Sequence, residues 1–427
     1  MKASKFLAAG ILAGAALIST ASAQQKIYIT GSTAFRSVTN TQISALLSGT
    51  VTIASTNSTL GSANGVTWTG GNIGGTAVTI KAAWTGSASG IQSVAANNIS
   101  TAPTKFLKDG ATGTANADPN GTTPDAPESA IPDVCMADNL QSSTVFTGGT
   151  YATLTDIPVG VVSFTWAASK NFPLNGGTAP FSNYSMSKKV AQQLLSGGAV
   201  PLGAFTGLAA DQATPSGPPA RVAYASGRNP DSGTRIITLA ESGYGVASFV
   251  KQYMPTVNGS AQITSLDLYP TETINGISTV VDGNSGENSG ATLRGYLVNT
   301  LTAAAYTGGS LPNGEAGPSF VVTYLGTSDF NSVSGSGAVA LGWNGVPVSQ
   351  AAIMNGAYTF WSTERLMYRP DLGNGTTGGP AIKLTFATNL KNNILAATSA
   401  TLSPNVALAD LLVARAGDGG DISNPNF

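Results

Sequence analysis

The chain of 427 residues contains no histidine and only one cysteine, and both shortages narrow the chemistry open to it. Without histidine there is no Ser-His-Asp or Cys-His triad and no His-based metal site. The single cysteine, Cys135, excludes an intramolecular disulfide. Its neighbours Val134 and Met136 are apolar, which favours a buried small hydrophobe over a reactive thiol. We therefore expect no catalytic residue, no metal ligand and no cofactor, and a binding role rather than an enzymatic one.

Long apolar runs are missing everywhere except at the N-terminus. There, Lys2 and Lys5 precede the apolar residues 6–18, and Ala21-Ser22-Ala23 follows, which together are typical of a secretory signal peptide. No cysteine follows this cleavage site, so a lipid anchor has no support. We expect residues 1–23 to be removed, leaving a periplasmic or extracellular protein without a direct membrane anchor.

Charge is also scarce, with 20 basic and 21 acidic side chains in the whole chain. Loss of Lys2 and Lys5 with the signal leaves 20 − 2 = 18 bases against 21 acids, a net charge near −3. A mildly acidic protein has no general attraction for nucleic acid or anionic lipid. If this protein binds an anion, a local site has to do it.

Short apolar strands alternate along the chain with stretches of helical spacing, which predicts α/β layers with mainly parallel strands. About 400 residues exceed one ordinary core, so two domains are expected. Residues 100–130 are rich in Thr, Pro, Gly and Asp and predict a long surface insertion. The expected strands are 26–29, 78–84, 131–136, 157–164, 221–224 and 320–325, and the expected helices are 34–47, 91–96, 185–195, 236–244 and 292–305.

Turns of small residues follow three of these strands, at Gly31-Ser32-Thr33, at 86–90 and at Ser232-Gly233-Thr234. A strand that enters a helix through such a turn leaves backbone N–H groups and hydroxyls at a helix N-terminus, which favours an anion. Ligands gather beyond the carboxyl ends of strands in parallel α/β sheets. Arg228, six residues before Thr234, adds an always-charged bidentate partner. Together these features predict capture of a tetrahedral oxyanion.

Asp138 follows the strand expected over 131–136, and its carboxylate would repel an anion. Its presence makes sense if it accepts a proton carried by the ligand, as monohydrogen phosphate carries one and sulfate at neutral pH does not. A ligand without that proton would set two acceptors face to face, which costs on the order of several kcal/mol. The alternative is that Asp138 caps the following helix.

The order of these motifs resembles the phosphate-binding proteins of ABC importers, which have the type II periplasmic binding protein fold. The resemblance spans most of residues 26–370, and it implies inorganic phosphate as the ligand and a membrane ABC importer permease as the partner. The matching segments are the first anion loop at 31–35, Gly-Ser-x-x-Gly-Ile at 86–91, an Asp-x-x-x-x-Asp strand end at 133–138, Arg-x-x-x-Ser-Gly-Thr at 228–234 and Asn-Gly-x-Tyr at 355–358.

This resemblance also implies an α/β architecture of two domains with hinge-connected mixed sheets. The first domain would comprise residues 24–160 plus 325–427, and the second residues 161–324. Closure of the hinge around the ligand would produce the form that the importer recognises. The implied ligand contacts are Ser32, Thr33, Ala34, Ser87 and Asp138 on one side, and Arg228, Ser232, Gly233 and Thr234 on the other.

Two positions depart from the family pattern. Pro230 stands where the family usually has an Asp that orients the arginine, and Asp231 stands where a Gly is typical. Either Asp231 orients Arg228 instead, or the arginine is held in a different way. The adjacent Arg235 is expected to be solvated or to lie behind the ligand contacts, and the Gly- and Asp-rich tail after Arg415 is expected to be flexible.

Three other functions remain open. The ligand could be another protonatable oxyanion, such as arsenate. The chain could be a surface or matrix protein that reuses the fold, which the Gly-, Thr- and Asn-rich loops and the missing lipid anchor permit. A phosphate-ester hydrolase with Ser232 or Thr234 as nucleophile is disfavoured by the lack of histidine and of an evident metal cluster.

Overall fold

The computed structural model describes residues 24–111, 127–173, 184–212, 221–274, 277–307, 311–315 and 317–424, and the backbone of residues 113–114. The expected signal peptide and the middle of the 100–130 insertion lie outside these described residues. Within them, no helix combines the length and the apolar character that crossing a membrane requires.

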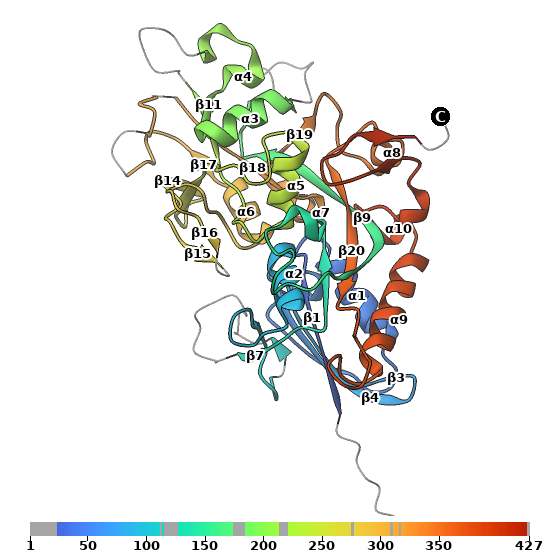
Figure 1. Cartoon of the computed structure of the whole chain (residues 1–427). Helices are drawn as coiled ribbons and strands as arrows, with labels where there is room; N and C mark the ends of the chain where they lie inside the picture. The colour runs from blue at the N-terminus through green and yellow to red at the C-terminus, as the bar shows by residue number, and fades with distance from the viewer. Residues whose placement is uncertain are drawn as a thin grey trace, which may run out of the picture.

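One large mixed sheet runs along the molecule in the order β11-β12-β18-β9-β20-β8-β1-β4-β3-β2-β6, with β19 also on β9 and β10 on β19 (Figure 1). Its strands are β1 (Gln25–Gly31), β2 (Thr52–Ser55), β3 (Gly65–Ile73), β4 (Thr76–Ala83), β6 (Gly113–Thr114), β8 (Val134–Ala137), β9 (Thr155–Ala168), β10 (Ser185–Met186), β11 (Ala199–Pro201), β12 (Val222–Ala225), β18 (Phe320–Gly326), β19 (Val339–Trp343) and β20 (Trp361–Tyr368). The prediction of an α/β fold with mixed sheets is confirmed.

The sheet is less parallel than the strand–helix alternation predicted. β1 is parallel to β4 and β8, and β12 is parallel to β18. β9, however, is antiparallel to β18, β19 and β20. The expectation of mainly parallel strands is wrong because β9 and β20 are long strands that run back through the sheet, a feature that spacing along the chain does not encode.

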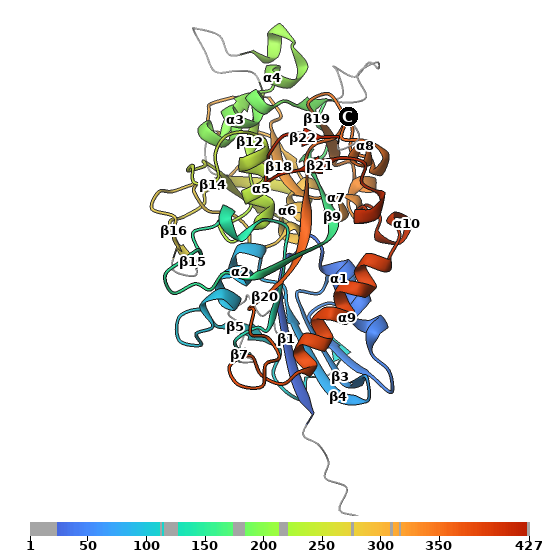
Figure 2. The same ribbon diagram turned by 45° about the vertical axis from the view of Figure 1, so that its right-hand side comes forward.

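Helices flank the sheet on both sides. Figure 2 shows α1 and α9 side by side on one side of the strands, and α2 on the other side, next to β1 and β8. The helices are α1 (Arg36–Leu46), α2 (Ser87–Ala96), α3 (Lys188–Gly197), α4 (Gly203–Thr206), α5 (Gly233–Glu241), α6 (Gly290–Leu297), α7 (Thr327–Asn331), α8 (Gln350–Met354), α9 (Ile382–Ala396) and α10 (Ser399–Leu402). Each of the five expected helices therefore has a counterpart, with shifted ends.

The helix expected over 292–305 shows the largest shift. α6 begins at Gly290 because the Ser289 hydroxyl accepts a hydrogen bond from the Thr292 amide, and it ends at Leu297. Residues 300–301 instead form β17, which pairs with β14. The smaller sheets consist of β13 (Tyr253–Val257), β14 (Gln262–Leu268) and β17 (Thr300–Leu301), of β15 (Thr273–Ile274) and β16 (Ile277–Ser278), of β5 (Thr104–Phe106) and β7 (Glu128–Ala130), and of β21 (Ala414–Arg415) and β22 (Ile422–Ser423).

Strand β9 lies in the middle of the large sheet and connects its two parts. Its first part, residues 155–163, pairs with β20, and its last part, residues 164–168, pairs with β18 and β19. Trp166, near its end, packs edge-on against Tyr324 of β18 and stacks with Phe360, which precedes β20. One strand and its aromatic contacts therefore hold both parts of the sheet together.

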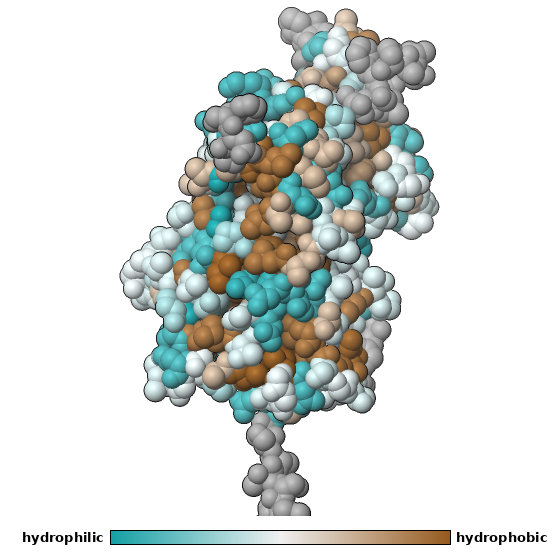
Figure 3. Space-filling view, turned by 90° about the vertical axis from the view of Figure 1, so that its right-hand side faces the viewer, coloured by the Kyte–Doolittle hydropathy of each residue, from teal (hydrophilic) through white to brown (hydrophobic). Residues whose placement is uncertain are grey.

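The surface on the side of α8 and α9 is a mixture of residue types. Figure 3 shows several hydrophobic patches on this face, divided by hydrophilic residues rather than joined into one apolar surface. Leu384 and Leu395 of α9 are among the exposed large hydrophobic residues of the chain. Scattered apolar residues of this kind are normal on soluble proteins.

Candidate anion site

The turns after β1, β4 and β8 meet because these strands are parallel neighbours, whose carboxyl ends share one edge of the sheet. The Ser32 amide donates to the Met136 carbonyl at 2.9 Å, and the Gly86 amide donates to the Gly31 carbonyl at 2.9 Å. Gly31 has a φ of +117°, and a Cβ there would lie 1.9 Å from the Met136 carbonyl oxygen. Only glycine fits this position, so the turn's small residues serve close packing of the three strand ends.

Asp138 lies at the centre of this group and is 1 % exposed. Its Oδ1 accepts a 2.6 Å hydrogen bond from the Ser87 hydroxyl, and the Ser32 hydroxyl lies 3.5 Å from Oδ2. Burial raises the pKa of Asp138 to about 6, although the Ser87 hydroxyl and the Arg228 charge act in the opposite direction. The carboxyl is therefore poised to change protonation close to neutral pH.

Asp138 does not cap the segment that follows it. The short 3₁₀ turn over Gln141–Ser143 has no side-chain cap, and the Leu140 amide donates to Asp418 instead. The alternative reading of Asp138 as a cap for the following helix is thus not supported by its hydrogen bonds.

Arg228 approaches from the loop after β12 and is 2 % exposed. Its Nε donates to the Glu287 carbonyl at 3.0 Å and its Nη2 to the Asn288 carbonyl at 2.8 Å. Its Nη1 donates to the Thr33 hydroxyl at 3.2 Å, which joins this loop to the turn after β1. The guanidinium has N–H donors beyond these three for a further acceptor.

No carboxylate oxygen of the described residues lies within 4.0 Å of the Arg228 guanidinium, so its hydrogen-bond partners are all neutral oxygens. Burial lowers the pKa of Arg228, and the more distant charges of Asp329 and Asp138 only partly oppose this effect. A buried cation without a paired anion is costly. The local electrostatics therefore favour the arrival of an anion.

The Ser232-Gly233-Thr234 turn begins α5. The Ser232 hydroxyl accepts from the Arg235 amide at 3.3 Å and so caps this helix. A Cβ on Gly233 would lie 1.5 Å from Oδ1 of Asp138, so the carboxyl packs directly against the first residue of α5. Next to it, the Ala88 amide of α2 donates to the Asp231 carbonyl at 3.0 Å. The N-termini of α2 and α5 therefore face the same small volume, where helix dipoles favour negative charge.

The structure brings most of the predicted contact residues together. Direct contacts connect Ser32 and Ser87 with Asp138, Thr33 with Arg228, and Gly233 with Asp138, while Ser232 and Thr234 adjoin Gly233 in the same buried turn. Ala34 adjoins Thr33 and packs against Gly326. We call the group Ser32, Thr33, Ser87, Asp138, Arg228, Ser232, Gly233 and Thr234 the anion site.

For each arginine of the motif the structure decides between two expected alternatives. Asp231 does not orient Arg228, because the backbone carbonyls of Glu287 and Asn288 hold the guanidinium. Arg235 is not solvated: it is 4 % exposed, and its Nη1 donates to the Arg228 carbonyl at 3.2 Å. It lies behind the motif and supports the Arg228 backbone. Residues 287 and 288 are too far from Arg228 along the chain for any motif to indicate their role.

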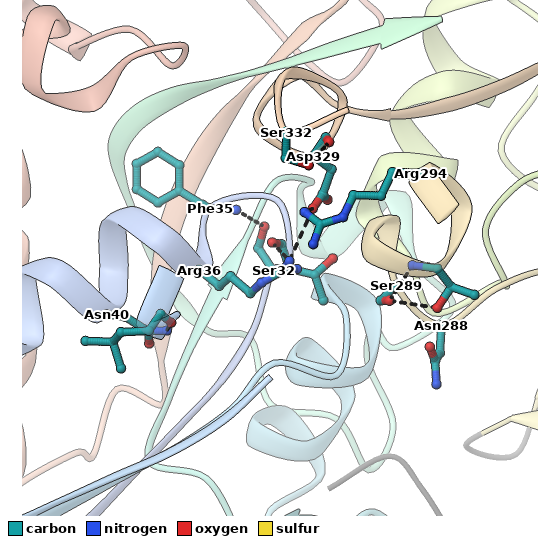
Figure 4. A network of polar contacts seen from close by, with 12 residues as sticks. Ser32, Phe35, Arg36, Asn40, Asn288, Ser289, Arg294, Asp329 and Ser332 are labelled. Atoms are coloured by element: carbon teal, nitrogen blue, oxygen red, sulfur yellow. Dashed lines mark hydrogen bonds and ion pairs between the residues drawn. The ribbon is translucent and has the colours of Figure 1, made fainter. Parts of the chain in front are cut away.

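Figure 4 shows a buried ion pair between Arg36 and Asp329. Arg36 of α1 donates to the Thr33 carbonyl at 2.9 Å and pairs with Asp329 of α7 at 3.2 Å. Asp329 also lies 3.4 Å from Arg294 of α6, the helix capped by Ser289 next to Asn288. This network links the turn after β1 to the segment that holds Arg228, and sequence reasoning missed it.

A second buried carboxyl, Glu364 of β20, adjoins the site. It is fully buried, and burial together with the charge of Asp138 raises its pKa well above the usual range for glutamate. Sequence reasoning missed Glu364 because it lies within a strand, in no recognisable motif.

A polar cavity of about 300 Å³ lies beside the arginine loop. Asn229, Asp231 and Asn288 line it from the Arg228 side, and Thr85 and Ser89 line it from the α2 side. The cavity therefore adjoins Asn288, whose carbonyl accepts a hydrogen bond from Arg228.

The C-terminal segment is held in place, against the expectation of a flexible tail. Arg415 pairs with Glu241 at the end of α5 at 2.9 Å and lies over the Trp361 ring. Asp418 accepts hydrogen bonds from the Leu140 amide at 2.8 Å and the Ser143 hydroxyl at 2.6 Å. The segment therefore connects the end of α5 with the loop that follows Asp138.

The chain matches no protein-family model, and no curated protein matches it. It is similar to solved structures, among them an ABC-type phosphate transport receptor from Vibrio cholerae, at 11% identity over 89% of this chain and 99% of that one, with a TM-score of 0.40. A phosphate-binding protein from Stenotrophomonas maltophilia is 14% identical over 91% of this chain and 92% of its own, with a TM-score of 0.40. PstS from Borrelia burgdorferi is 9% identical over 90% and 99%, with a TM-score of 0.37. At such values any assignment of function rests on the residues of the site.

Proposed function

We propose that this protein is an exported solute-binding protein, not an enzyme, that captures inorganic phosphate and delivers it to a membrane ABC importer permease. The observation that supports this most strongly is Arg228, a buried cation whose hydrogen-bond partners are neutral oxygens. A bound oxyanion supplies the missing negative charge and accepts from the guanidinium's remaining N–H groups. The N-termini of α2 and α5 add further donors.

Asp138 supports phosphate over fully ionised anions. Its carboxyl packs against Gly233 at the start of α5, beside the hydroxyls of Ser32 and Ser87. A ligand held there that carries a proton can donate it to the ionised carboxyl, whereas sulfate presents only acceptors. Arsenate shares this protonation with phosphate and remains the second candidate ligand for the same site.

The proposal includes a hinge. Residues 24–160 plus 325–427 would form one domain and residues 161–324 the other, with the crossing strand β9 as one of their connections. Contacts such as Thr33 with Arg228, and Ala88 with Asp231, would then belong to the closed form. Closure would hide the anion from water and create the surface that the permease recognises.

Calorimetric titration of residues 24–427 tests this proposal, after bound anion has been removed by unfolding and refolding. We expect tight binding of phosphate and arsenate and little response to sulfate near neutral pH. R228Q should abolish phosphate binding, and R369Q, which alters an arginine paired with Asp371 outside the anion site, should not. Absence of binding to all three anions would refute the proposal, and self-association on a sizing column would then favour a structural role.

A further inference from the structure

Glu364 occupies an unusual position next to the anion site. Arg365 of β20 pairs with Ala137 of β8, so one step further along both antiparallel strands sets Glu364 level with Asp138. On its other side Glu364 pairs with Gly160 of β9, where the Phe35 ring packs. Neither carboxyl oxygen of Glu364 has a donor in full hydrogen-bond geometry among the described residues. A fully buried glutamate without such donors is unstable as an anion.

The charges around Glu364 do not compensate an ionised carboxylate. From β8, Asp138 faces it, and from the turn after β1 the Ser32 hydroxyl lies close. Cys135 lies on the opposite face of β8, where it is level with Met367. Arg365, its neighbour on β20, is paired with Asp156 of β9 at 2.9 Å, so its charge is already balanced. Helix α2, which packs on the same strands, contains no titratable residue.

Arg228 and Asp418 act on the neighbouring Asp138, with opposite signs. Two adjacent buried carboxyls cannot both ionise without a large electrostatic penalty, so one of them holds a proton. The ionised form is more stable on Asp138 than on Glu364, because the Ser87 hydroxyl donates a 2.6 Å hydrogen bond to Asp138 and the positive charge of Arg228 stabilises its carboxylate. The proton therefore resides on Glu364.

We propose that Glu364 is a positioning residue of the anion site: it holds the proton that Asp138 would otherwise take up, and so keeps Asp138 as the ionised acceptor. This inference rests on the proposed function, in which Asp138 accepts the proton of the ligand. Ionisation of Glu364 at alkaline pH then places a second negative charge beside Asp138 and the bound anion. Affinity for phosphate falls as a result, through a group that does not contact the ligand.

The protonation of Glu364 is testable without any ligand. An acid that is protonated in the folded chain and ionised in the unfolded chain releases its proton on unfolding. Stability is therefore unaffected below the pKa of unfolded glutamate, at about 4.3, and declines as pH rises from there toward the folded-state pKa. Within that window the unfolding constant of the natural chain should rise, relative to that of E364Q, by up to about tenfold per pH unit.

The experiment measures denaturant unfolding of residues 24–427 and of E364Q between about pH 4.5 and 9, in a buffer without phosphate. E364M, which has a similar length and no charge, provides a second variant if E364Q fails to fold. E364D retains a titratable carboxyl and is the matched control. We expect the ratio of unfolding constants to increase with pH for E364Q and E364M, and a smaller increase or none for E364D. A ratio independent of pH for both neutral variants would overturn the proposal.

Phosphate titrations of the same proteins, from about pH 7 to pH 10, test the effect on binding. We expect the affinity of the natural chain and of E364D to fall at alkaline pH, and that of E364Q to change less than about threefold over the range. Parallel loss in the natural chain and E364Q would overturn the role of Glu364. If no protein binds phosphate while the unfolding ratio still depends on pH, the proposed function fails and the protonated Glu364 stands as a structural feature only.

Discussion

Arg228 and Thr33 are 195 residues apart in the sequence, and their side chains meet in a 3.2 Å hydrogen bond. Thr33 belongs to the turn after β1, and Arg228 to the loop after β12. Further hydrogen bonds hold each residue in place. Arg36 donates to the Thr33 carbonyl, and the Arg228 guanidinium donates to the carbonyls of Glu287 and Asn288. This bond therefore reports directly on how the two sides of the anion site fit together.

Replacement of the Thr33 hydroxyl by a methyl group in T33V should weaken phosphate binding by about tenfold to a hundredfold. Hydrogen bonds to charged groups contribute about 1.5–3 kcal/mol, and the variant removes one from Arg228 while keeping the side-chain volume. Calorimetric titration measures the effect. T41V, which removes an exposed hydroxyl bound to the Ser37 carbonyl in α1, is the control and should bind normally. Equal affinity in both variants would contradict a role for Thr33.

The D138N variant should lose the preference for phosphate over sulfate. An amide cannot accept the ligand's proton as an ionised carboxylate does, and it removes a negative charge that repels sulfate. Competition titrations with the two anions at neutral pH give the ratio of affinities directly. D267N, at an exposed aspartate of β14, should leave the ratio unchanged. An unaltered ratio in D138N would show that selectivity arises elsewhere.

The raised pKa of Asp138 also predicts how the stability of the anion-free chain depends on pH. Its pKa is about 6 in the folded chain and 3.8 in its ordinary state, so the folded chain holds the extra proton between these values. The contribution of Asp138 to stability should therefore decline as pH rises from about 4 to 6 and then level off, with a loss of about 3 kcal/mol that adds to the decline expected from Glu364. D138N should lose this contribution, so the unfolding constant of the natural chain should rise with pH relative to that of D138N, and should not rise relative to that of D267N. Denaturant unfolding across this range decides the matter, and an identical decline in D138N would contradict the shift.

G233A should disrupt the anion site, because the added Cβ would lie 1.5 Å from Oδ1 of Asp138. The carboxyl has to move from Ser87, so we expect loss of most phosphate affinity and a fall in the free energy of unfolding of about 1–3 kcal/mol. G295A in α6 is the matched control, since nothing lies within 4 Å of the Cβ built there. That variant should be neutral or stabilising by up to about 1 kcal/mol. Normal binding by G233A would refute the contact between Asp138 and α5.

The sequence alone was sufficient for the local features. Apolar runs and small-residue turns predicted the strands and helices around the anion site, because a strand, a turn and a helix are each encoded by neighbouring residues. α5, for example, begins at the turn that Ser232-Gly233-Thr234 indicated. Ser32, Ser87 and Asp138 touch one another because they follow the parallel strands β1, β4 and β8, whose ends meet by topology.

Long-range features depended on the tertiary structure. The antiparallel course of β9 and β20 places Glu364 beside Asp138, and chain reversal brings Glu287 and Asn288 to Arg228. The sequence predicts a flexible tail after Arg415. In the structure, however, Asp418 accepts from the loop after Asp138, and Arg415 pairs with Glu241 at the end of α5. Burial, ion pairing and proton sharing depend on which distant residues become neighbours, so composition and spacing indicate the anion site while only the packed chain decides its electrostatics.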